Sequence, residues 1–169
     1  MAKLKQMNKF KITLILLLVA TVTFAQQSPR KQATGTIAGA NVEVDYGAPS
    51  VRDRAIWGGL VPYAKVWRAG ANENTTISFD KDVTIDGHKV PAGKYGFFII
   101  PNEDAAWDVI FSKKNDAWGS NGYSADNDLF RTKAKVKFDD ERVEQMGFKV
   151  AEKAIVFAWE KARLKIPVK

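Results

Sequence analysis

The sequence predicts an all-β domain, a two-sheet antiparallel β-sandwich of the jelly-roll kind, interrupted by one long irregular loop. After residue 25 the chain holds three leucines, against 13 valines, nine isoleucines and eight phenylalanines. Leucine favours helices, whereas β-branched and aromatic residues favour strands. Apolar and polar residues alternate in about eight short runs separated by turn residues, which is typical of sandwiches and barrels. No stretch keeps the 3.6-residue period of an amphipathic helix.

The first 25 residues predict an export signal that precedes the domain. Four lysines and no acidic residue come before an apolar run of 13 residues, 12–24. Thr23 and Ala25 then supply a possible signal-cleavage site before Gln26. The apolar run is shorter than the roughly 20 residues that span a bilayer, so we expect no stable membrane anchor after cleavage. The protein is therefore expected in the periplasm or outside the cell.

Charge and cysteine content limit the classes of partner that the protein can bind and the interactions that can stabilise its fold. Lys and Arg number 26 and Asp and Glu 19, and removing the four lysines of residues 1–25 lowers the net charge from +7 to +3. This small excess argues against nucleic acid as a partner. The chain has no Cys, so neither a disulfide nor a cysteine-linked lipid can support it, and packing alone must stabilise the fold. The sequence leaves the oligomeric state open.

A polar leader and a single domain follow the export signal. Residues 26–33 are polar, contain Pro29, and are expected to form a flexible leader before one β-sandwich domain over residues 34–168. The predicted strands span residues 34–37, 41–46, 75–79, 83–85, 95–100, 107–111, 133–138, 155–159 and 164–168.

The earlier strands are supported by alternation and by the turns between them. In the second strand Val42, Val44 and Tyr46 share one face, and the third strand alternates in the same way. The fourth ends at Asp86-Gly87, a dipeptide favoured in tight hairpin turns. Residues 95–100 are apolar on both faces, which indicates a central strand.

The later part of the chain alternates less evenly. Residues 107–111 alternate, and in residues 133–138 we expect Ala134, Val136 and Phe138 to point inward. Residues 139–147 lose the alternation and are interpreted as containing one helical turn. Two long stretches rich in Gly, Pro and polar residues, 47–74 and 113–127, predict loops. Within the second of these, Trp118 lies among polar residues and is expected to be exposed.

The first long loop holds the densest cluster of recognition side chains. Guanidinium groups match carboxylates, phosphates and paired sugar hydroxyls, aromatic rings stack on sugars or cations, and amide or carboxylate groups orient a ligand by hydrogen bonds. The candidate ligand-binding residues are Arg54, Tyr63, Trp67, Arg68, Asn72 and Glu73. A structural interpretation stays open, in which these side chains satisfy the backbone of the loop itself and Gly70 permits a sharp turn.

The same counts exclude several catalytic and metal sites. The chain has no Cys, so it has no cysteine nucleophile, and its one histidine, His88, would be the only nitrogen ligand for a zinc ion. His88 follows a hairpin turn and is interpreted as a solvated turn residue. Asp126 and Asp128 lack the rest of an EF-hand pattern. We therefore assign no catalytic residue, no metal and no cofactor. A pair of carboxylates for hydrolysis could be drawn from Asp45, Glu73 and Asp108, but only if two of them lie close together in space.

Several stretches together resemble one bacterial family. They include VDYGAPS at 44–50, WRAGANENTT at 67–76 and PAGKY at 91–95. The pattern resembles the domain of unknown function 2911 over roughly residues 33–168, and this resemblance implies a secreted β-rich domain without an established activity, substrate or cofactor. Where this chain has Asp53 and Ala69, the family pattern usually has Gly and Thr.

Three functions remain open at this stage. The first is an exported, non-enzymatic binding module of the bacterial envelope, whose ligand is an unknown small molecule or glycan bearing hydroxyl or carboxylate groups. The second is a carboxylate-based hydrolase that uses Glu73 or another acid. The third is a structural or interaction protein of the envelope with no small-molecule site. Arg68 and Glu73 side chains that are buried and paired with the loop backbone would exclude the first two at this site, whereas a concave, solvent-open pocket bearing them would support binding.

Overall fold

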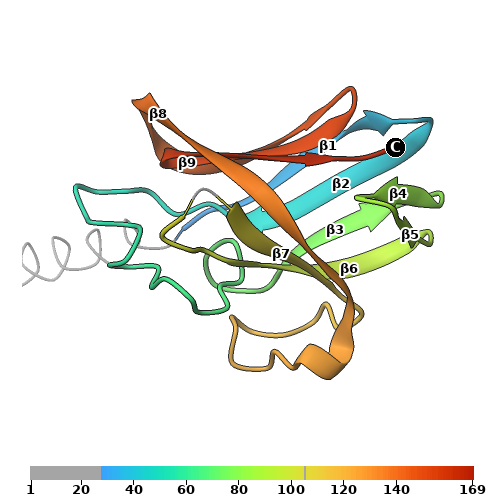
Figure 1. The fold of residues 1–169 in the computed structure, drawn as a ribbon, viewed down its shortest axis with the longest axis horizontal. Helices are drawn as coiled ribbons and strands as arrows, with labels where there is room; N and C mark the ends of the chain where they lie inside the picture. Colours follow the sequence, from blue (N-terminus) through green and yellow to red (C-terminus); the bar gives the residue numbers. More distant parts are fainter. Residues whose placement is uncertain (1–27, 105) are drawn as a thin grey trace, which may run out of the picture.

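The computed structural model describes residues 28–104 and 106–169, and these form an all-β domain (Figure 1). The predicted export signal over residues 1–25 lies outside the described residues. The strands are β1 (Arg30–Ile37), β2 (Ala40–Gly47), β3 (Thr75–Phe79), β4 (Val83–Ile85), β5 (His88–Val90), β6 (Gly93–Ile100), β7 (Ala106–Ser112), β8 (Asp128–Ala151) and β9 (Ala154–Pro167). One 3-10 turn, Ala125–Asn127, precedes β8. Within the described part of the chain, no helix has the length and apolar composition to cross a membrane.

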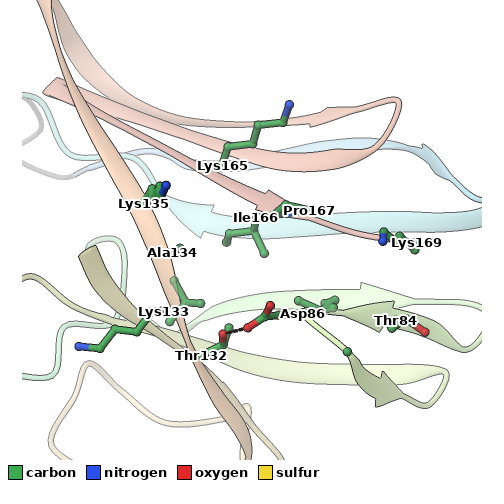
Figure 2. A pocket seen from close by; sticks show the side chains of 13 residues that line it. Thr84, Asp86, Thr132, Lys133, Ala134, Lys135, Lys165, Ile166, Pro167 and Lys169 are labelled. Atoms are coloured by element: carbon green, nitrogen blue, oxygen red, sulfur yellow. Dashed lines mark hydrogen bonds between the residues drawn. The ribbon is translucent and has the colours of Figure 1, made fainter. Parts of the chain in front are cut away.

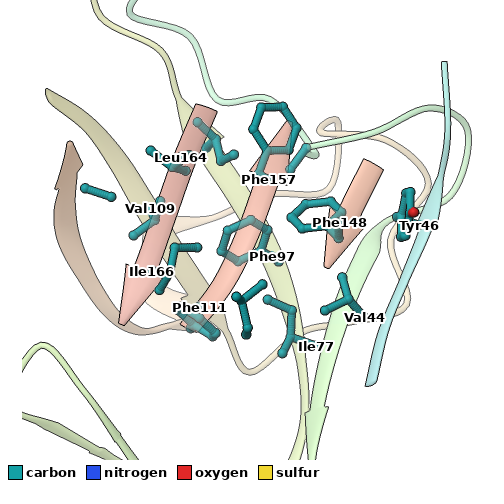
Figure 3. Close-up of a cluster of buried hydrophobic side chains, with 14 of the residues drawn as sticks. Val44, Tyr46, Ile77, Phe97, Val109, Phe111, Phe148, Phe157, Leu164 and Ile166 are labelled. Carbon is teal, nitrogen blue, oxygen red and sulfur yellow. The ribbon is translucent and has the colours of Figure 1, made fainter. Parts of the chain in front are cut away.

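Seven of the strands form one strongly curved antiparallel sheet in the order β1-β2-β3-β6-β7-β8-β9, and the β4–β5 hairpin forms a separate pair. The long strand β8 connects two layers. Its residues 128–135 pair with β7, and its residues from Val136 to Ala151 pair with β9. The β8–β9 ribbon thereby lies over the face that β2, β3 and β6 present (Figures 1 and 3). This arrangement confirms the predicted antiparallel sandwich.

The core fills the space between the two layers. Ile77, Phe97 and Phe111, from β3, β6 and β7, face Phe157 and Leu164 from β9 (Figure 3), and all five are fully buried. Aromatic rings meet edge to face, as in Phe97 and Phe111 with centroids 5.3 Å apart, an arrangement that adds to the stabilisation from burial. The apolar residues that alternate in the sequence are the ones that supply this core.

Several local expectations were wrong. The two strands expected over 155–159 and 164–168 form one strand, β9. Strand β1 begins at Arg30, because residues 30–33 pair with residues 44–47 instead of forming a leader. The helical turn expected over 139–147 is extended strand within β8. The pairing of β8 with β9 shifts register twice there, and such bulges break the alternation while the chain stays extended.

Phe138 departs from its expected inward position, since it is 47% exposed. The first register shift comes directly after Phe138. Its ring still contacts Trp107 edge to face at 6.1 Å, so one side of the ring is covered and the other is open to solvent. Trp118 is exposed as predicted, at 67%.

Candidate functional site

The first long loop is fastened to the sheet at several points and carries the candidate residues with it. The backbone N–H of Trp67 donates to the carbonyl of Ile99 at 2.8 Å, and the N–H of Ile99 donates back to Trp67 at 2.9 Å. The Trp67 indole N–H donates to the carbonyl of Gly70 at 3.2 Å. Paired backbone groups hold a loop in one conformation, so this loop is an ordered support for side chains.

Gly70 has a different role from the turn that the structural interpretation gave it. A Cβ at Gly70 would lie 2.7 Å from the Thr75 hydroxyl and 2.9 Å from the Gly47 carbonyl. Glycine is therefore needed for the close approach of the loop to β2. The left-handed backbone conformation falls instead on Ala69 and Asn72, whose φ angles are 49° and 63°.

The loop borders a cavity of about 260 Å³, which is lined by three of the six candidate residues: Arg54, Trp67 and Arg68. The remaining lining residues come from the same loop, the start of the described chain and β9. They are Ser28, Pro49, Ser50, Arg52, Leu60, Val61, Gly70, Ala71 and Trp159. The lining therefore includes three arginines, two tryptophans and no carboxylate.

Arg54 and Arg68 differ in what holds them. The Arg54 guanidinium donates to the carbonyls of Val51 at 3.0 Å and Ser50 at 2.6 Å, so it braces the loop as the structural interpretation expects. Arg68 is partly buried, its Nε is inaccessible, and no acceptor among the described residues takes a hydrogen bond from it. Burial lowers the pKa of the Arg68 guanidinium, because a charge removed from water is costly without a partner.

Arg68 also lies beside the second long loop. A Cβ at Gly119 would stand 3.4 Å from Arg68 Nη1, and the Gly119 N–H donates to the carbonyl of Asn72 at 3.1 Å. Backbone pairing between Glu73 and the exposed Trp118 continues this contact. The two long loops, more than 40 residues apart in the sequence, therefore meet around Arg68.

The other three candidates lie outside the cavity lining. The Tyr63 ring packs over Gly58, and the Asn72 amide donates to the carbonyl of Ser28 at 3.4 Å. The Glu73 side chain is exposed and lies 3.8 Å from the Arg30 guanidinium. The structure thus brings Arg54, Trp67 and Arg68 together and leaves Tyr63, Asn72 and Glu73 at the periphery.

Of the nine lining residues that were not among the six candidates, two carry an arginine or tryptophan side chain, Arg52 and Trp159. Arg52 belongs to the same Arg-Asp-Arg triplet as Arg54, so charge clustering was a signal that could have included it. Trp159 comes from β9 and stacks on Trp67 with ring centroids 5.7 Å apart. No local pattern links Trp159 to a loop about 90 residues earlier, since their contact depends on how β9 crosses the sheet. The Trp159 indole N–H is buried and has no partner among the described residues.

None of the carboxylates considered for hydrolysis lines this cavity, and each lies beside a cation. Asp45 and Glu73 lie beside the same cation, Arg30, at 2.7 Å and 3.8 Å. Asp108 lies 3.1 Å from the Lys133 ammonium. Asp128, which was considered for calcium, accepts from Arg131 at 3.1 Å. Over residues 28–104 and 106–169, no three His, Asp or Glu side chains gather as metal ligands would. His88 is exposed and stacks on Phe130 with centroids 4.6 Å apart.

Comparison with known proteins adds a family assignment. Residues 28–168 match the family described as protein of unknown function (DUF2911). The chain belongs to this family. No curated protein and no solved structure matches it. In this DUF2911 protein Asp53 has a φ of 55°, in the left-handed region that favours glycine.

Proposed function

We propose that this DUF2911 protein is an exported, non-enzymatic binding module of the bacterial envelope, and that it holds a small carboxylate-bearing ligand in the Arg68 cavity. The observation that carries the proposal is the Arg68 guanidinium, which is partly buried without an acceptor among the described residues. A partly buried cation is destabilising unless an anion compensates it. A bound carboxylate would supply that anion, with the two-pronged geometry that a guanidinium matches.

The charge around the cavity favours an anion over a cation or a neutral ligand. Arg52, Arg54 and Arg68 line it without a single carboxylate. The hydrogen bonds of Arg54 go to neutral carbonyls, so they leave its positive charge in place. Arg54 is exposed, so water screens its repulsion of the half-buried Arg68, and both charges attract an anionic ligand.

The cavity walls favour a ligand with an apolar or ring-shaped body. Trp67 contributes the surface of a partly exposed indole ring, with the buried Trp159 behind it, and Leu60 contributes an exposed aliphatic side chain. Aromatic side chains commonly provide the flat surface on which a sugar ring rests. The volume of about 260 Å³ suits one small unit, such as an acidic monosaccharide, better than an extended glycan. Left-handed φ angles at Arg52, Asp53, Ala69 and Asn72 place backbone strain around the same cavity, as is common at functional sites.

A thermal-shift experiment with a matched pair of sugars tests the proposal. Glucuronate should raise the melting temperature in a dose-dependent way, because a ligand that binds only the folded state stabilises it by mass action. Glucose at the same concentration should raise it far less, and citrate shows whether a carboxylate suffices without a ring. Sodium chloride at matched ionic strength accounts for screening.

Arginine variants separate binding from loop support. Arg68→Gln should abolish the shift with glucuronate and leave the melting temperature without ligand unchanged or higher, since Arg68 has no hydrogen-bond acceptor among the described residues to lose. Arg131→Gln removes the same charge from a cluster outside the cavity and should keep the shift. If no acid raises the melting temperature and Arg68→Gln lowers it, the protein is a structural component instead. We do not extend the proposal to hydrolysis, because no carboxylate lines the cavity.

A further inference from the structure

The outer face of the β8–β9 ribbon carries a dense group of cationic side chains. On both strands apolar residues point into the core, and the residues between them point outward. Figure 2, a view of the cavity between β4, β8 and β9, shows Lys165 extending from the side of β9 opposite to Ile166. Lys133 is paired with Asp108 at 3.1 Å. The remaining outward cations, here called the cationic face, are Lys135 and Lys137 from β8 and Lys161, Arg163 and Lys165 from β9.

The pairing of the two strands places these cations side by side. Lys137 pairs directly with Arg163, so its diagonal neighbours on β9 are Lys161 and Lys165. By the same rule Lys135 is a diagonal neighbour of Arg163. The four lysines are exposed and Arg163 is partly buried. Like charges directly opposite in a ladder are unfavourable, and an anion bound between them removes this cost.

The carboxylates of the domain do not neutralise the cationic face. Among the described residues, none lies within ion-pair distance of its five cations. Arg163 donates to backbone carbonyls, including that of Glu160 at 3.0 Å, and neutral carbonyls leave its charge in place. The Glu160 carboxylate accepts from the backbone N–H of Lys161. Asp139, two residues after Lys137, forms no ion pair with another described residue. The charge of the cationic face is therefore available to a partner.

The composition of the cationic face limits the class of its partner. The large apolar side chains exposed among the described residues are Leu60, Trp118 and Phe138. Leu60 and Trp118 belong to the long loops, and Phe138, one residue after Lys137, points to the other face of β8. A site for a membrane surface adds apolar side chains that enter the lipid, and a site for single-stranded nucleic acid adds rings on which bases stack. A face that offers charge alone favours a hydrated polyanion.

We infer that the cationic face binds a linear acidic polysaccharide that carries carboxylates on successive sugar units. Outward residues of one strand are about 6.5 Å apart, so one extended polymer contacts several of the five cations at once. A single exposed ion pair is weak, whereas contacts with one polymer reinforce each other through effective concentration. The inference does not rest on the Arg68 cavity, which shares no residue with the cationic face.

Titration calorimetry with polygalacturonate, a linear polymer of an acidic sugar, tests this inference. Polygalacturonate should bind, and its affinity should fall as sodium chloride is added, because salt screens exposed charges. The fully methyl-esterified polymer keeps the sugar units and lacks the charge, so it should bind at least about tenfold more weakly.

Charge variants locate the binding site. Lys135→Gln, Lys137→Gln and Lys165→Gln together should weaken binding of the acidic polymer about tenfold, as expected for the loss of three exposed ion pairs. The same three lysines changed to Arg should keep the affinity, because the charge is retained. Circular dichroism checks that both variants are folded. A matched control makes three Gln substitutions at exposed lysines outside the cationic face and should leave the affinity unchanged: Lys65→Gln, Lys89→Gln and Lys113→Gln.

The inference is overturned if polygalacturonate does not bind, if its methyl ester binds equally well, or if the two sets of Gln substitutions have equal effects. Tighter binding to phosphatidylglycerol vesicles or to single-stranded DNA would also overturn it, in favour of a membrane or a nucleic acid. Arg68→Gln should leave the affinity for polygalacturonate unchanged, and the Gln variant of the cationic face should keep the thermal shift with glucuronate. Failure here is therefore distinguishable from failure of the carboxylate site in the first loop.

Discussion

The indole ring of Trp67, in the first long loop, stacks on that of Trp159, in β9, with centroids 5.7 Å apart and ring planes 19° from parallel. Trp57 stands edge to face against both rings, at 5.9 Å and 5.8 Å. This contact joins the irregular loop to the second layer of the sandwich, and it forms one wall of the Arg68 cavity. The stability of the fold and the shape of the candidate site therefore depend on the same pair of rings.

Replacing Trp159 by Ala should lower the free energy of unfolding by about 3–5 kcal/mol, since the ring is buried and its removal leaves a cavity. Urea denaturation followed by circular dichroism measures this without relying on tryptophan fluorescence. Trp118→Ala is the control, because Trp118 is 67% exposed and its pairing with Glu73 is between backbones. A loss of stability at Trp118 as large as that at Trp159 would contradict the assignment of the core.

Gly96, in β6, should not tolerate a side chain. A Cβ there would lie 2.3 Å from the Lys114 carbonyl and 2.7 Å from the Asn74 Oδ1, so Gly96→Ala forces the second long loop away from the sheet. We expect a destabilisation of about 1–3 kcal/mol, as for other overpacked sites, measured by urea denaturation. Gly147→Ala, in β8, should be almost neutral because the nearest atom is the Tyr46 hydroxyl at 4.0 Å. Equal effects of the two substitutions would refute the close packing at Gly96.

Asp53→Gly should stabilise the protein. Asp53 has a φ of 55°, and the left-handed conformation costs an L residue about 1–2 kcal/mol that glycine avoids. The ion pair that is lost, with Arg142 at 3.6 Å, is at the surface and contributes little. Asp53→Ala is the matched control, because it removes the same carboxylate and keeps the Cβ. The melting temperature should rise for Asp53→Gly alone, and a rise for both variants would show that the carboxylate, and not the backbone, was responsible.

Alkaline pH should destabilise the fold partly through Tyr123. Burial first, and then the neighbouring Asp128, raise the pKa of the Tyr123 hydroxyl, which donates to Asp128 at 3.1 Å. The Tyr123 hydroxyl therefore keeps its proton in the folded state at a pH where it has lost that proton in the unfolded chain. This contribution to stability is complete below the unfolded pKa of about 10 and is lost as pH rises through the folded pKa.

Urea denaturation at pH 8 and at pH 11 measures this loss. Between the two pH values, the free energy of unfolding of Tyr123→Phe should fall less than that of the unsubstituted protein. Part of the drop should remain, because burial and Asp82 also raise the pKa of Tyr95, and Tyr95→Phe should remove a further part. If the free energy of unfolding of Tyr123→Phe falls as much as that of the unsubstituted protein, the Tyr123 hydroxyl has the same pKa in the folded and unfolded states.

Local patterns predicted the fold well where one face of a strand meets the core. Val42, Val44 and Tyr46 are buried as their alternation predicted, because the two-residue period of a strand places them on one face. The pattern failed at residues 139–147, where bulges add residues that have no partner in β9. It also missed the start of β1, because residues 30–33 are held by pairing with β2 and carry no apolar signal.

The candidate site was predicted in part. The density of Arg and Trp in the first long loop correctly indicated Arg54, Trp67 and Arg68 as neighbours in space. The same density could not distinguish Arg54, which hydrogen bonds to loop carbonyls, from Arg68, which does not. That difference depends on which carbonyls the folded loop directs at each guanidinium.

The sequence by itself determined the strand-rich composition and the loop that carries the arginines. It also predicted the bounds of β3 and β4, and those of β2, β6 and β7 to within two residues. These follow from side-chain shape and from a period of two, which are local properties. Only the tertiary structure decided that β8 would pass from β7 to β9, that Trp159 would meet Trp67, and that Arg68 would be left without an acceptor among the described residues. Each of these depends on contacts between residues far apart in the chain, and the curvature of the whole sheet brings those residues together.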